Sequence, residues 1–172
     1  MSAITVIETA RLRLRGPRPS DFEAHAAFSA SERSVGVGGP YSRADAFHNF
    51  CAMIGHWPMR GYGRWIVADK ATDAPLGVVG PMFPEGWPEP EIAWTVYEKA
   101  EGKGIAFEAA AAARAHAYGA LGWKTAVSLT DPGNLRSQAL AKRMGCVRDG
   151  VFVHPEAGDL WIWRHPAPET LQ

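Results

Sequence analysis

A strand-like segment joins an alanine-rich helix near the middle of the chain through a junction of small residues. Residues 92–97 read IAWTVY, residues 104–121 have a helical pattern, and Gly102, Gly104 and Ala106 form the junction. The first turn of a helix leaves backbone N–H groups without partners and carries the positive end of the helix dipole. Small side chains let those N–H groups close on a pyrophosphate. The junction therefore predicts a strand followed directly by a helix, with an anion bound between them.

Two common phosphate-binding motifs do not fit this junction. A Walker A loop needs Gly-x-x-x-x-Gly-Lys-Ser/Thr, but Lys103 is followed by Gly104, and no glycine lies five positions before Gly102. The dinucleotide fingerprint needs a third small residue, and Phe107 occupies that position. Both motifs are therefore excluded.

Hydrophobic periodicity along the chain predicts an α+β fold with a mixed sheet. Glycine-rich residues 31–42 are expected to be a loop, and Pro58 and Gly61 are expected to end the second helix at Trp57. A strand–helix–strand unit surrounds the glycine junction, and the whole chain, residues 1–172, is expected to be a single domain. Period-two alternation predicts a strand within residues 10–16, and strand-like runs bounded by turn residues predict further strands within residues 63–70, 76–83, 91–98, 124–130, 146–154 and 158–165. Helical spacing predicts helices within residues 19–30, 43–57, 104–121 and 131–145.

Composition narrows the classes of partner. Eighteen basic and eighteen acidic residues give no net charge, so no nucleic acid or anionic membrane is expected as a partner. No apolar run approaches the roughly 20 residues that span a bilayer, and the N-terminus lacks a signal-peptide pattern, so a cytoplasmic protein is expected. Cys51 and Cys146 lie far apart, and the six histidines show no ligand spacing, so no metal site is predicted.

Three stretches of the chain resemble the GNAT (Gcn5-related) N-acetyltransferase superfamily. Residues 101–106, EGKGIA, match its Q/R-x-x-G-x-G/A motif at Gly104 and Ala106 but have Glu101 at the first position. Residues 8–24, ETARLRLRGPRPSDFEA, and residues 102–150, with Asn134, Ser137 and Gly145 in register, look like the branch that acetylates ribosomal-protein N-termini. The resemblance implies the GNAT acyl-CoA N-acyltransferase fold, a mostly antiparallel mixed sheet flanked by about four helices, with acetyl-CoA as cosubstrate.

The resemblance also assigns roles to cofactor-binding positions. Backbone N–H groups of the junction would hold the coenzyme A pyrophosphate, with the Glu101 side chain facing solvent because an inward carboxylate would repel it. Val96 would offer backbone groups to the pantetheine arm, and Asn134 and Ser137 would lie near the thiol. The superfamily's usual tyrosine acid is replaced by Ala141, so Ser137 is the candidate proton donor to the leaving thiolate. The junction positions are Glu101, Gly102, Lys103, Gly104, Ile105 and Ala106.

Acetyl transfer to an amine needs a neutral amine, and Glu91 is the candidate general base by resemblance. Glu89 and Asp131 are alternatives, and positioning alone without a base is a further one. Trp87 is expected beside the acceptor cleft, which would lie between residues 34–41, the second helix and residues 83–91.

The predicted function is direct acetyl transfer from acetyl-CoA to a primary amine, either a small molecule or a peptide N-terminus. The alternative, kept open by Ala141, is a non-catalytic acyl-CoA-binding or regulatory module. A homodimer is a further possibility, because an exposed hairpin strand at residues 160–165, LWIWRH, would be able to pair between copies.

Overall fold

The computed structural model describes residues 4–171, and its eight strands form one mixed sheet. The strand order is β1-β2-β3-β4-β5-β6-β8-β7, and every neighbouring pair is antiparallel except β5 and β6. This confirms the predicted mostly antiparallel mixed sheet. The strands are β1 (Ile7–Glu8), β2 (Leu12–Arg15), β3 (Trp65–Asp69), β4 (Pro75–Met82), β5 (Glu91–Val96), β6 (Val127–Thr130), β7 (Val147–His154) and β8 (Gly158–Arg164).

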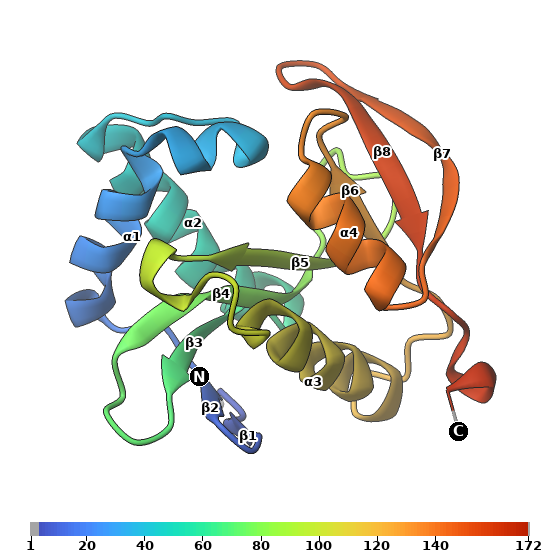
Figure 1. Ribbon diagram of the computed structural model, residues 1–172, viewed down its shortest axis with the longest axis horizontal. Coiled ribbons are helices and arrows are strands. Elements are labelled where there is room, and N and C mark those ends of the chain that lie inside the picture. Colours follow the sequence, from blue (N-terminus) through green and yellow to red (C-terminus); the bar gives the residue numbers. More distant parts are fainter. Residues whose placement is uncertain (1–3, 172) are drawn as a thin grey trace.

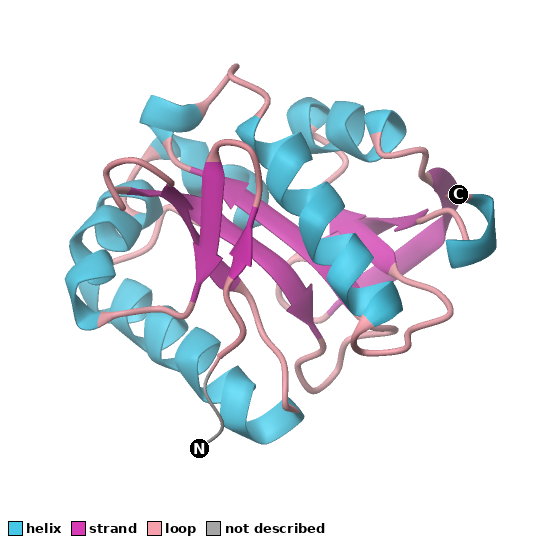
Figure 2. Cartoon of the chain, turned by 90° about the horizontal axis from the view of Figure 1, so that it is seen from below, coloured by secondary structure: helices cyan, strands magenta, loops and turns pink. Residues whose placement is uncertain are grey.

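Four α-helices cover the sheet within the described part of the chain, as predicted (Figure 1). Helix α3 crosses one face of the central strands, and the view from below places α2 on the opposite side of the sheet (Figure 2). No helix of the described residues is both long and apolar enough to cross a membrane. The helices are α1 (Phe22–Ser29), α2 (Arg43–Arg60), α3 (Ile105–Gly119) and α4 (Leu135–Arg143).

The alternation of strand side chains divides the core between the two faces. Trp65 and Val67 of β3 belong to the cluster that includes the α3 alanines, whereas Ile66 packs with Phe50 and Met53 of α2. Because successive side chains of a strand point to opposite faces, a continuous apolar strand such as β3 needs helices on both sides. Four alanines of α3 are fully buried, which brings that helix close to the sheet: Ala109, Ala110, Ala113 and Ala117.

The sheet is split between β5 and β6. The two strands share a single register pair, Glu91 with Val127, and diverge beyond it (Figure 1). Tyr97 N–H bonds to β4, whereas the Pro90 carbonyl accepts from Val127 N–H on the β6 side. Backbone groups alternate in direction along a strand, so the N–H and C=O groups of residues 94 and 96 point into the gap. The opening in the sheet therefore exposes hydrogen-bonding groups of β5.

Three sequence-based expectations are corrected by the fold. Helix α2 continues past Pro58 and ends at Gly61, which adopts a left-handed conformation. Residues Glu32–Val37 form a 3-10 helix, η2, rather than an irregular loop. No residue of 160–165 is exposed, because β8 lies between β6 and β7 and Trp163 is buried. The exposed apolar side chains of the hairpin are Val147, Val151 and Val153 of β7.

Candidate active site

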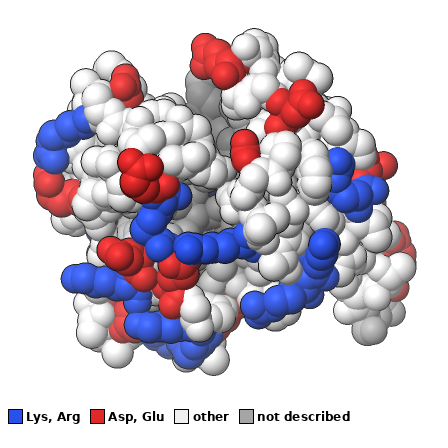
Figure 3. All heavy atoms as spheres, turned by 45° about the horizontal axis from the view of Figure 1, so that its top comes forward, with Lys and Arg blue, Asp and Glu red and all other residues white. Residues whose placement is uncertain are grey.

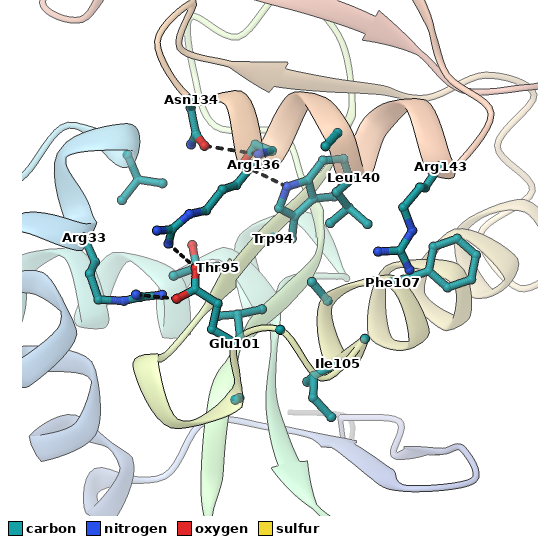
Figure 4. A pocket seen from close by; sticks show the side chains of 18 of the residues that line it. Arg33, Trp94, Thr95, Glu101, Ile105, Phe107, Asn134, Arg136, Leu140 and Arg143 are labelled. Atoms are coloured by element: carbon teal, nitrogen blue, oxygen red, sulfur yellow. Dashed lines mark hydrogen bonds and ion pairs between the residues drawn. The ribbon is translucent and has the colours of Figure 1, made fainter.

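A cavity of about 590 Å³ opens between the beginning of α3 and helix α4 (Figure 4). The gap between β5 and β6 forms its inner wall through residues 94–96. Gly102, Gly104, Ile105 and Ala106 line it from the predicted junction. The anion site predicted from the glycine spacing therefore coincides with the opening in the sheet.

The junction exposes a row of backbone donors toward this cavity. Gly102 and Gly104 have φ values of +72° and +75°, a left-handed conformation that favours glycine. None of the N–H groups of residues 102–107 donates to another of the residues 4–171. Unpaired amides at a helix N-terminus bind anions. The local chain geometry thus fits a diphosphate without any side-chain ligand.

Arg11 holds the junction in this conformation from the neighbouring β1–β2 turn. Its Nη1 donates to the Lys103 carbonyl at 2.9 Å, and its Nε pairs with Glu108 of α3 at 2.7 Å. The Lys103 side chain turns back to the Lys99 carbonyl, and Lys103 does not line the cavity. Any contribution of Lys103 to the site would therefore come from its backbone.

Glu101 does not face solvent freely, contrary to expectation. Its side chain lines the cavity, is 33% exposed, and is paired with Arg33 at 2.5 Å and with Arg136 (Figure 4). The hydrogen bond from Arg33 is the main reason why the pKa of this carboxyl lies below its ordinary value. The two guanidinium groups neutralise a carboxylate that would otherwise repel a phosphate. An acidic residue is tolerated at this motif position because arginines from η2 and α4 converge on it.

Ser137 and Asn134 lie where the cavity reaches the N-terminus of α4. Asn134 caps the helix, since its side chain accepts from Ser137 N–H at 3.1 Å, and its Nδ2 donates to the Gly36 carbonyl at 3.3 Å. Ser137 Oγ accepts from Trp94 Nε1 at 3.2 Å. Within the described chain this hydroxyl donates to no acceptor, so its own hydrogen remains available to a bound group.

A second cavity of about 630 Å³ adjoins the first one. It lies between α1, η2, α2, the β4–β5 loop and the β7–β8 hairpin, and a space-filling view shows a hollow in that part of the surface (Figure 3). Three of its boundaries, η2 with its following loop, α2 and the β4–β5 loop, are those expected for the acceptor cleft. Six residues line both cavities and mark where they meet: Phe28, Val37, Trp94, Thr95, Asn134 and Ser137.

Glu91 is a buried carboxylate in the wall of this second cavity. It accepts from Leu129 N–H at 2.9 Å and from Trp87 Nε1 at 2.6 Å, and it is only 5% exposed. Burial raises its pKa, and the two hydrogen bonds oppose that rise. Trp87 lines the cavity as expected and holds the carboxylate in place. A carboxylate with a raised pKa next to a cavity has the properties of a proton acceptor.

The two alternative bases lie in different settings. Glu89 forms a two-pronged ion pair with Arg164, at 2.6 and 2.7 Å, and does not line the cavity. Asp131 lines it, but its carboxylate accepts from Gly133 N–H at 2.6 Å within a turn. Glu91 therefore remains the candidate base with the most suitable environment.

Several cavity residues were not found from the sequence. The first cavity is lined by three arginines, Arg33, Arg136 and Arg143. The guanidinium carbon of Arg143 lies 5.0 Å from the centroid of the Phe107 ring. Arg64 and four histidine or acidic residues, namely His25, His56, His154 and Glu156, line the second. These residues come from separate elements, and no motif or spacing in the sequence relates them. No group of three or more metal-ligating side chains occurs within the described residues.

Comparison with known proteins identifies relatives over nearly the whole chain. A family model described as an acetyltransferase (GNAT) domain matches residues 11–147. An acetyltransferase structure from Agrobacterium tumefaciens is 36% identical, covers 96% of each chain and superposes with a TM-score of 0.88.

Two more distant structures share the fold alone. A GNAT-family acetyltransferase from Bacillus anthracis is 22% identical, with 93% and 97% of the two chains covered and a TM-score of 0.77. RimL, a ribosomal L7/L12 α-N-protein acetyltransferase in complex with coenzyme A, is 16% identical, with 94% and 97% covered and a TM-score of 0.74.

Proposed function

The chain belongs to the GNAT acetyltransferase family, and on this premise we propose that it transfers an acetyl group directly from acetyl-CoA to a primary amine. The meeting of the two cavities carries the proposal. One cavity ends at unpaired amides suited to a diphosphate, the other contains a buried carboxylate, and both are lined by Trp94 and Ser137. A thioester and an amine entering from the two sides would meet at that common wall.

The backbone donors and the positive charge of the first cavity support coenzyme A as its ligand. The amides of residues 102–107 would hold the diphosphate, and Arg33, Arg136 and Arg143 supply positive charge along the same wall. Backbone groups at residues 94 and 96 face the gap, so Val96 can pair with the amide-containing pantetheine arm in the manner of a sheet strand. When bound, acetyl-CoA supplies the thioester carbonyl that the amine attacks and the thiolate that leaves.

The chain's own residues supply the proton transfers and the positioning. Glu91 takes a proton from the neutral attacking amine, directly or through water, while its two donors keep the carboxylate oriented. Ser137 gives its hydroxyl proton to the departing thiolate as the C–N bond forms and the C–S bond breaks, and solvent water returns a proton to the Ser137 oxygen. Trp94 Nε1 steadies the Ser137 oxygen. Holding both reactants at one wall adds a further large contribution to the rate.

A thiol-release assay tests the proposal. The protein is incubated with acetyl-CoA and a panel of primary amines, including peptide N-termini, and free thiol is followed by a chromogenic reagent. Release above the level without amine, with an acetylated amine detected by mass spectrometry, is the expected result. Tight coenzyme A binding without turnover of any amine would instead identify a binding or regulatory module.

A further inference from the structure

Arg64 lies in the wall of the second cavity, the proposed acceptor site, and its side chain has no partner among the described residues. It directly precedes β3 and is only partly exposed. Its guanidinium makes no hydrogen bond or ion pair with any residue from 4 to 171, whereas Arg15, buried at 4% exposure, is held by Asp21 and Asp73. Removing a guanidinium from water without a counter-ion is unfavourable. A cation kept in this setting is suited to an anion that arrives with a ligand.

His25 adds a second unused polar group beside Arg64. It lies on α1, lines the same cavity, and both of its ring nitrogens are buried without a partner among the described residues. Burial, assisted by the nearby Arg64 charge, lowers the pKa of His25 to about 4. The imidazole is therefore neutral at pH 7 and has one free N–H donor. By contrast, both ring nitrogens of His56 are engaged, by the Tyr62 carbonyl and by Phe83 N–H.

Both signs of charge line this cavity. Glu91, Asp131 and Glu156 come from β5, the turn after β6 and the β7–β8 hairpin, whereas Arg64, the one Lys or Arg among the described residues that line the cavity, directly precedes β3. Arg64 and Glu91 influence each other's ionisation but form no ion pair within the described residues. A ligand that carries a positive and a negative group would match both the carboxylates and the guanidinium.

We infer that the acceptor is a primary amine that also carries a carboxylate, which binds Arg64 and the His25 N–H while the amino group lies at Glu91. This inference rests on the proposed function. A guanidinium matches the two oxygens of a carboxylate. A single guanidinium with one neutral donor suits a carboxylate better than a phosphate dianion, which has three acceptor oxygens. The carboxylate belongs either to a free amino acid or to an acidic side chain at a peptide N-terminus.

Matched pairs of acceptors test the inference and distinguish these two sources. The first arm compares β-alanine and 4-aminobutyrate with their carboxamides, and the second compares a peptide beginning with Asp with the same peptide beginning with Asn. In the protein as it stands, kcat/KM is expected to favour the carboxylate of at least one pair by roughly 10- to 100-fold, the value of a hydrogen bond to a charged group. If only the peptide pair shows a preference, for Asp over Asn, the carboxylate belongs to a peptide N-terminus.

The Arg64→Gln variant completes the test. It should remove the carboxylate preference while the turnover of the carboxamides stays within a few-fold, and Arg64→Lys should restore part of it. In the absence of ligand, Arg64→Gln should not lower the melting temperature, because it removes an uncompensated charge. A thermal shift with millimolar 4-aminobutyrate or Asp peptide, seen in the wild type and lost in Arg64→Gln, measures binding independently of turnover.

The outcomes separate this inference from the proposed function. Equal kcat/KM for the carboxylate and amide members of both pairs would overturn the carboxylate assignment while leaving N-acetylation in place. Equal losses for charged and neutral acceptors in Arg64→Gln would likewise overturn it. Thermal stabilisation by the carboxylate probes without any acetyl transfer would support the anion site and refute the proposed enzyme activity.

Discussion

Replacing Glu91 by glutamine removes the proposed base with almost no change in shape. The carboxylate accepts from Leu129 N–H at 2.9 Å and from Trp87 Nε1 at 2.6 Å. A glutamine side chain has one carbonyl oxygen and one NH2 group, so it can accept from one of these donors, and its NH2 group then faces the other one. The proton acceptor is lost, and one buried donor loses its partner.

The structure sets the size of both effects. Loss of a general base lowers kcat/KM by roughly 10²- to 10⁴-fold. The unpaired donor costs about 1–3 kcal/mol of folding free energy, but the variant also avoids burying a carboxylate whose pKa is raised by its surroundings. These two contributions to stability oppose each other. The expected phenotype is a large loss of rate in a protein that remains folded.

The pH dependence of kcat/KM distinguishes a base from a positioning group. Below the pKa values of both Glu91 and the amine, log kcat/KM should rise with a slope of two, because each group must lose a proton. Above the Glu91 pKa the slope should fall to one until the amine is neutral. In Glu91→Gln the slope should be one throughout the acidic range. Glu89→Gln is the control, since Glu89 pairs with Arg164 outside the cavity and should retain the wild-type profile.

Two results would refute this reasoning. A Glu91→Gln rate within about threefold of the wild type would show that positioning alone drives the reaction. A variant that keeps the break in slope would assign that ionisation to another group, for which Asp131 is the next candidate. Circular dichroism and the melting temperature of both variants show whether a loss of rate reflects unfolding.

Four further predictions follow from the same geometry. Gly104→Glu should abolish coenzyme A binding in calorimetry. Gly122→Glu is the control, because Gly122 has a similar φ of +68° and lies in an open position outside both cavities, so this variant carries the same backbone strain and should bind coenzyme A normally. Unchanged binding in Gly104→Glu would show that the diphosphate binds elsewhere. Ser137→Ala should lower kcat by roughly 100-fold or more and should retain the affinity for coenzyme A. If wild type and Ser137→Ala have equal rates, Ser137 only accepts the Trp94 hydrogen bond and has a structural role. Glu101→Gln should free two arginines and tighten coenzyme A binding about fivefold, equivalent to ~1 kcal/mol, an effect that weaker binding would contradict. Burial raises the folded-state pKa of Glu91 above its unfolded value, so the free energy of unfolding of the wild type should fall as pH rises between those two values, and Glu91→Gln should lack that decline. Denaturant titrations that give wild type and variant the same pH dependence would contradict the raised pKa.

Local patterns in the sequence predicted most elements correctly because their causes are local. Strand-like runs bounded by turn residues identified the seven longer strands, and helical spacing with caps such as Ser42 and Asn134 identified the four helices. Strand β1 was missed because two residues show no period. Pro58 was read as a helix end, but the chain continues helically around it and stops where Gly61 adopts a positive φ.

The candidate site residues were predicted from the glycine motif and from the family resemblance. The glycine junction has a backbone reason that can be read from residue types alone, and Asn134 as a cap is equally local. The environment of Glu91 was not predictable, because its burial depends on Leu129 and Trp87 lying beside it. The surroundings of Glu101 were not predictable for the same reason, since the two arginines that pair with it come from η2 and α4.

By itself, the order of residues determined the type and sequence of the helices and strands and the conformation of the glycine turn, because backbone sterics and hydrophobic period act over a few neighbouring positions. Tertiary structure alone decided which charges meet. Arg64 and Glu91 are 27 positions apart in sequence but line one cavity, and neither had a signal in the sequence that predicted a common site. Burial, pairing and pKa depend on distances in space, and those distances exist only once the sheet has opened between β5 and β6 and the helices have closed around it.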